Sequence, residues 1–147
     1  MHDDYQPTVD DWIAMLSIST RLNFPKVRRR AIKELTARLE EIDPFDLIGL
    51  AVKYDVQQWL MPAYRRIVTG PSLISHEEAQ KVPFLMAVML MRSREQHWKD
   101  FRSARHYSHS DPRSAADHII KSEVIMMDQV SNGAYAAASP AMEYTDM

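Results

Sequence analysis

The chain contains no cysteine and only three glycines among its 147 residues. Without cysteine there is no disulfide framework, no thiolate nucleophile and no cysteine-ligated zinc or iron–sulfur site. So few glycines argue against a glycine-rich nucleotide-binding loop and against a turn-dense all-β sandwich or barrel. The absence of disulfide-forming cysteines fits an intracellular protein, and we expect the protein to act in the cytoplasm or the nucleus.

Long apolar runs and a dominant charge are missing as well. The longest apolar run has eight residues, Phe84 to Met91, whereas a membrane span needs about 20. The N-terminal segment 1–4 contains two aspartates and no apolar core, so it does not resemble a secretory signal. Lys and Arg total 18 against 20 Asp and Glu, a net charge of −2, so no global positive field indicates nucleic-acid binding. We expect no membrane partner, and we regard a nucleic-acid partner as the weaker alternative to a protein.

Signals for the start of a helix recur along the chain. They are Thr8 with Asp11, Pro25, Asp43–Pro44 with Asp46, Pro62, Ser75 with Glu78, Pro83, and Asp111–Pro112. Thr8, Asp43 and Ser75 fit the first position of capping boxes. Proline suits the first turn of a helix, where its missing N–H would be unpaired anyway. Gly70–Pro71 has the form of a helix stop.

Apolar residues recur at helical spacing between these signals. The predicted stripes are Val27, Ala31, Leu35, Leu39 and Ile42; Phe84, Val88, Met91, Trp98 and Phe101; and Ala116, Ile120, Val124 and Met127. Spacings of three and four residues are those of amphipathic helices, and no strand-like alternation is present. We predict an all-α fold, a single bundle of six or seven helices. It should occupy 8–130, after a lead of 1–7 and before a tail, 131–147, that we expect to be disordered.

Methionine is abundant, with ten residues, and this points to two interpretations. Met fills irregular gaps in a core, and it also suits adaptable apolar binding surfaces. If the second interpretation holds, the partner would be a protein or a second copy of the chain. The candidate partner-binding residues are Met86, Met89, Met91, Met126 and Met127.

A basic segment supplies the alternative of nucleic-acid binding. Its candidate residues are Lys26, Arg28, Arg29, Arg30, Lys33 and Arg38. Such a stripe can neutralise phosphates. A solvated helix face explains it more simply, because three adjacent residues of a helix point in three directions and Arg30 can pair with Glu34.

Catalytic and metal-binding patterns are weak. His106, His109, Asp111 and His118 could supply metal ligands, but their spacing matches no closed site, so we predict no metal and no cofactor. No nucleophile, base and orienting group can be assembled from the sequence. We therefore predict that the protein is not an enzyme.

One long stretch carries a family resemblance. Residues 50–64 follow the pattern LAxKYxVxxWLxPAY. Further matching stretches are Ser17–Thr20, Asn23–Phe24, Val27–Ile32, Asp43–Asp46, Leu73–Ala79 and Ala87–Glu95. Together they resemble the helical region that follows the BTB/POZ domain in a large group of basidiomycete fungal proteins. The resemblance covers about residues 8–105 and does not extend to residues 106–147.

The resemblance implies a helical bundle used as a protein–protein interaction or scaffold domain. Tyr54 and Trp59 would then pack helix on helix, and Pro62 would fix a helix start. The BTB fold itself has no counterpart within these residues, so its dimerisation and cullin binding do not carry over. No catalytic or ligand-binding residue carries over either.

Overall fold

The computed structural model describes residues 6–104 and 114–122, and every regular element in them is helical. The α-helices are α1 (Val9–Arg21), α2 (Pro25–Thr36), α3 (Pro44–Lys53), α4 (Leu60–Thr69), α5 (His76–Gln80) and α6 (Phe84–Ala104). Two 3-10 helices, η1 (Leu39–Glu41) and η2 (Gln57–Trp59), lie between them, and residues 114–122 are also helical. The predicted all-α class is confirmed.

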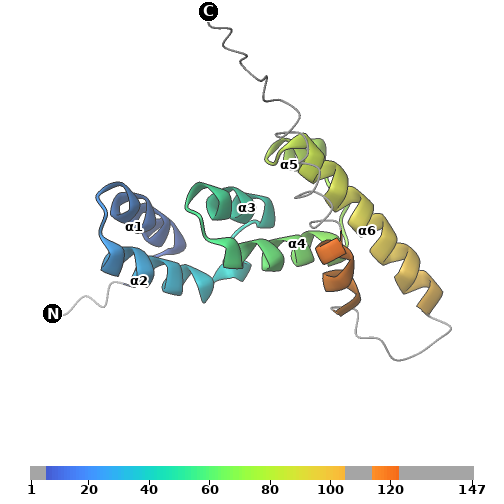
Figure 1. Ribbon diagram of the computed structural model, residues 1–147, viewed down its shortest axis with the longest axis horizontal. Helices are drawn as coiled ribbons and strands as arrows, with labels where there is room; N and C mark the ends of the chain where they lie inside the picture. The colour runs from blue at the N-terminus through green and yellow to red at the C-terminus, as the bar shows by residue number, and fades with distance from the viewer. Residues whose placement is uncertain (1–5, 105–113, 123–147) are drawn as a thin grey trace, which may run out of the picture.

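The helices pack largely on their neighbours in sequence. α1 contacts α2, α3 contacts α4, and α5 contacts α6, while α4 also packs against α6. Figure 1 shows the α1–α2 hairpin at one end of the molecule, α3 and α4 in the middle, and α6 running along the other end. No described helix is both long and apolar enough to cross a membrane.

The predicted helix starts are largely confirmed. Thr8 and Ser75 each form a complete capping box, with Asp11 and Glu78 as the respective partners. Pro25 is the first residue of α2. Pro62 lies in the first turn of α4. Side-chain caps therefore set where α1 and α5 begin, and proline, which has a fixed φ and no N–H, suits the first turns of α2 and α4.

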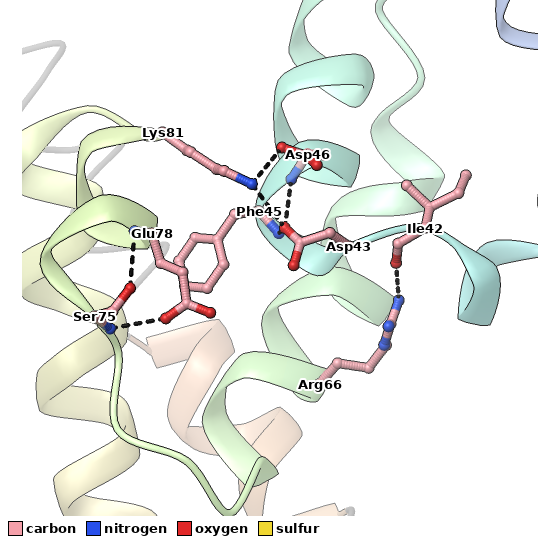
Figure 2. A network of polar contacts seen from close by, with 8 residues as sticks. All are labelled: Ile42, Asp43, Phe45, Asp46, Arg66, Ser75, Glu78 and Lys81. Carbon is pink, nitrogen blue, oxygen red and sulfur yellow. Dashed lines mark hydrogen bonds and ion pairs between the residues drawn. The ribbon is translucent and has the colours of Figure 1, made fainter. Parts of the chain in front are cut away.

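The start of α3 differs in one respect from the prediction. Asp43 caps it by accepting from the backbone N–H groups of Phe45 and Asp46 at 3.0 and 3.2 Å. The Asp46 side chain, however, is not the expected box partner. It accepts from Nζ of Lys81 at 2.8 Å, and Figure 2 shows Lys81 reaching both Asp43 and Asp46 from the end of α5. An ion pair to another helix has replaced the local contact.

Two helices end at residues with left-handed backbone. Asn23 (φ 55°) follows α1 and Asp55 (φ 53°) follows α3, and Asn and Asp tolerate this conformation better than most residues. Beyond each, an N–H reaches back to the last turn: Phe24 to the Ser19 carbonyl at 2.8 Å, and Val56 to that of Ala51 at 2.9 Å. This is the Schellman pattern, and it fixes the direction of the chain after each helix.

The core forms around side chains from α1 to α4. Its largest fully buried members are Leu16, Leu35, Leu47, Ile48, Trp59 and Val68. The predicted stripe from Val27 to Ile42 is only partly correct. α2 ends at Thr36, η1 follows it, and Val27 is exposed. The chain bends after Thr36, so Leu39 and Ile42 reach the core from outside the helix.

The predicted apolar stripe of α6 reaches the core only in part, since Val88 and Trp98 are half-buried. The buried side chains of this helix are Ala87, Leu90, Ser93, Arg94 and His97, whereas Phe84 is 84% exposed and Met91 and Phe101 are also exposed. A small residue such as Ala87 allows close helix packing. Arg94 is accommodated because its Nη1 donates to the Ile67 carbonyl at 2.9 Å, near the end of α4. The larger apolar side chains are displaced toward solvent.

The tail 131–147 and the boundary at residue 130 lie outside the described residues.

Candidate functional site

The described methionines do not form one surface. Met86 is half-buried, packs against the core and accepts a weak hydrogen bond from the Tyr64 hydroxyl at 3.8 Å. Met89 is also half-buried, whereas Met91 is exposed. Met126 and Met127 lie outside the described residues. Of the predicted set, Met91 is the described member that both faces solvent and lines a groove.

That groove runs between α6 and the segment that joins α4 to α5. We call it the α6 groove. It has a volume of about 590 Å3 and is lined by Pro71, Leu73, Ile74, Met91, Arg94, Glu95, Trp98 and Arg102. Leu73 is 86% exposed, and Met91 faces it from α6 at 43%. Two large apolar side chains exposed at one groove make this region the candidate docking surface.

Trp98 forms the aromatic centre of this region. Its ring packs edge-on against Phe101 and His97, with centroid distances of 5.6 and 5.9 Å. Its indole N–H is shut off from water and has no acceptor among the described residues. Burial lowers the pKa of His97, so its imidazole favours the neutral form. Trp98 therefore gives the α6 groove an aromatic wall.

Charged side chains border the α6 groove. Glu95 pairs with Lys99 at 2.8 Å, and this hydrogen bond lowers the pKa of the Glu95 carboxyl. The Nε of Arg102 donates to the Trp98 carbonyl at 3.3 Å. An apolar centre within a charged border is the arrangement typical of protein interfaces.

A more polar cleft lies on the other side of Trp98. It has a volume of about 540 Å3 and is lined by Glu40, Pro62, Arg65, Arg66, Thr69, His97, Trp98 and Phe101. Its charged groups have structural partners. Arg65 holds both carboxylate oxygens of Asp117 at 2.7 and 2.8 Å. Arg66 donates to the carbonyls of Leu39 and Ile42 at 2.8 and 2.7 Å, and the second bond is visible in Figure 2. These contacts leave the cleft less suited to a ligand than the α6 groove.

The predicted nucleic-acid-binding residues divide into two groups. Arg28 donates to the Tyr54 carbonyl at 2.7 Å, and Arg38 to the Pro7 carbonyl at 2.8 Å. Both are therefore used within the fold. Lys26, Arg29 and Lys33 are exposed, as is Arg30, which pairs with Glu34 at 2.8 Å.

Within the described part of the chain, no three His, Asp or Glu side chains converge as metal ligands. His118 is exposed. The other members of the histidine cluster, His106, His109 and Asp111, lie outside the described residues. That the protein binds no metal therefore stays a prediction.

Few features of the sequence indicate the α6 groove. Leu73 and Ile74 lie in a connecting segment, where no periodicity marks them, and Trp98 belongs to an amphipathic stripe, which favours a position in the core rather than beside a groove. An unusual signal was nevertheless present: large apolar residues next to Gly70–Pro71, in a segment that should face water. Comparison of the chain with protein-family models, with curated proteins and with solved structures gives no match.

Proposed function

We propose that the protein is a non-enzymatic protein–protein interaction domain, that the α6 groove is its docking surface, and that it acts in the cytoplasm or nucleus. The observation that carries the proposal is the pairing of exposed Leu73 and Met91 across a groove walled by Trp98. The resemblance to helical regions that follow BTB/POZ domains supports the same role. The partner would be a peptide segment that inserts two or three large apolar side chains.

The proposal fits the energetics of burial. Covering an exposed Leu or Met side chain stabilises a complex by about 1.5–3 kcal/mol. Binding energy at interfaces is concentrated in a few central side chains, and tryptophan is prominent among them. A groove of about 590 Å3 accommodates a few such side chains rather than a whole folded surface.

Selection from a random peptide library displayed on phage tests the proposal. We expect the enriched peptides to carry spaced apolar residues and to bind the purified full chain in fluorescence anisotropy. Met91→Glu and Leu73→Glu should each weaken binding by roughly tenfold or more, because a charge would enter the apolar contact.

Val52→Glu is the matched control, since Val52 is exposed on α3 outside the groove. It should leave binding unchanged, and circular dichroism should show all three variants folded. Failure to enrich any peptide, or equal binding by the Met91 and Val52 variants, would overturn the assignment.

Nucleic-acid binding is less well supported. Arg28 and Arg38 are engaged by backbone carbonyls, so the segment offers fewer free cations than its composition suggests. No specific observation favours a phosphate backbone as the ligand.

A further inference from the structure

The outward face of α2 carries a row of positive charge. Lys26, Arg29, Arg30 and Lys33 are spaced by three and four residues, which places them on one side of a helix. Ala31 and Leu35 occupy the opposite side and are fully buried. The row therefore points away from the core. It extends over about 10 Å, at about 1.5 Å per residue. We call these four residues the α2 basic row.

Most of this charge is unmatched. Arg30 forms an ion pair with Glu34. Among the residues that the structure describes, Lys26, Arg29 and Lys33 have no carboxylate within ion-pair distance. The whole chain has a net charge of −2, so the row is a local concentration of positive charge that the overall composition does not indicate. Ordered carboxylates of a partner would complement it.

An apolar turn adjoins the α2 basic row. Ile18, Leu22, Phe24 and Val27 lie at the α1–α2 turn and are each between 45% and 58% exposed. The turn is tightly hydrogen-bonded, with Leu22 N–H donating to the Ile18 carbonyl at 2.9 Å. Val27 and Arg30 are one helical turn apart and thus neighbours. The turn therefore exposes apolar side chains next to the α2 basic row.

We propose that the α2 basic row and the α1–α2 turn bind an acidic amphipathic helix of a partner protein. Its carboxylates, spaced by three and four residues, would face Lys26, Arg29 and Lys33. One or two of its large apolar side chains would cover Leu22 and Phe24. This surface is separate from the α6 groove, so the inference does not depend on the proposed function.

A short protein segment fits this surface better than an extended polyanion does. Duplex DNA would meet the cations through its phosphates but offers little apolar surface to cover Leu22 and Phe24, whereas an amphipathic helix offers both carboxylates and apolar side chains. A short helix contacts only the row and the turn. Phe24 is the one aromatic side chain at the turn, which is little for stacking nucleic-acid bases.

Fluorescence anisotropy with a designed peptide tests the inference. The probe is a labelled helix with glutamates at the four matching positions and leucine and phenylalanine near one end. A scrambled peptide of equal composition, duplex DNA and phosphatidylserine vesicles are the comparison ligands. We expect the designed helix to bind the full chain more tightly than all three, and more tightly still as salt falls.

Charge reversal locates the site. The double variant Arg29→Glu/Lys33→Glu should weaken binding by roughly tenfold or more, and Phe24→Ser by several-fold. Arg92→Glu, at an exposed position of α6, and Met91→Glu should leave the affinity within about twofold, which separates this surface from the α6 groove. Circular dichroism checks folding.

Three results would overturn the inference. They are equal binding of the scrambled peptide, tighter binding of DNA or vesicles than of the designed helix, and unchanged affinity in the Arg29/Lys33 variant.

Discussion

The indole N–H of Trp59 donates to the Thr36 hydroxyl at 2.8 Å, joining the residue before α4 to the last residue of α2. Trp59 is fully buried, so the indole has to find its acceptor within the protein. The Thr36 hydroxyl in turn donates to the Ile32 carbonyl at 2.6 Å. The bond therefore ties the α1–α2 hairpin to the middle of the molecule.

Removing this acceptor should destabilise the fold. Thr36→Val leaves the indole N–H unpaired, and we expect the free energy of unfolding to fall by about 1–3 kcal/mol. Thr36→Ser keeps the hydroxyl and should stay within about 0.5 kcal/mol of the wild type. Urea denaturation followed by tryptophan fluorescence measures both. Equal stability of the Val and Ser variants would show that the bond contributes nothing.

The two described glycines should respond in opposite ways to alanine. A Cβ at Gly49 would meet nothing within 4 Å, whereas one at Gly70 would lie 2.9 Å from the Arg66 carbonyl oxygen. Gly49→Ala should raise the free energy of unfolding by roughly 0.5–1 kcal/mol, because glycine is unfavourable within a helix. Gly70→Ala should lower it by about 1–3 kcal/mol, because backbone has to move. Thermal denaturation distinguishes the signs, and a stabilised Gly70 variant would contradict the expected clash.

Adjacent arginines should differ in their effect on stability. Arg28→Gln removes the hydrogen bond of 2.7 Å to the Tyr54 carbonyl, at an expected cost of about 1.5–3 kcal/mol for a charged donor. Arg29→Gln alters an exposed side chain and should change stability by less than about 0.5 kcal/mol. The two variants carry the same charge, so urea denaturation isolates the hydrogen bond. Matching midpoints would show that Arg28 acts only through its charge.

Acid should weaken the contact between α4 and the helical segment 114–122. Hydrogen bonding from Arg65 lowers the pKa of Asp117, and an unfolded Asp titrates near about 3.9. The stabilisation is therefore fully present above about pH 4 and is lost as the pH falls through the lower, folded pKa. It amounts to about 1 kcal/mol or less, because both side chains are partly exposed.

Asp117→Asn provides the comparison. The difference in free energy of unfolding between wild type and this variant should be constant from about pH 5 to 8 and shrink below about pH 4. Urea denaturation across this range measures it. A difference that grows on acidification would contradict a lowered pKa for Asp117.

Local signals in the sequence explain much of the fold. Thr8, Asp43, Ser75 and the prolines act on residues within one turn, so the helix starts that they predict match the structure. Contacts between helices follow other rules. Asp46 pairs with Lys81, on a segment more than one helix away, and no local pattern indicates this partner.

The candidate site was harder to predict for the same reason. Hydrophobic periodicity favours Phe84, Met91 and Phe101 on the core side of α6, because it reflects hydrophobic spacing and not how well a side chain packs against a neighbouring helix. In the structure the small Ala87 is buried instead. Arg94 is also buried, and its guanidinium donates to a carbonyl of α4. Likewise, composition placed six cations in one segment but did not show that Arg28 and Arg38 turn inward.

The packing of helices on their sequence neighbours also sets the kinetics of folding. Forming such contacts closes short loops, which carry a small entropic cost, and proteins with this topology fold in microseconds to milliseconds. The α1–α2 hairpin is held to the rest in part by the Arg28 and Thr36 side-chain bonds. It should therefore open as a cooperative unit before the remainder unfolds, and its amides should exchange with deuterium earlier than those of α4.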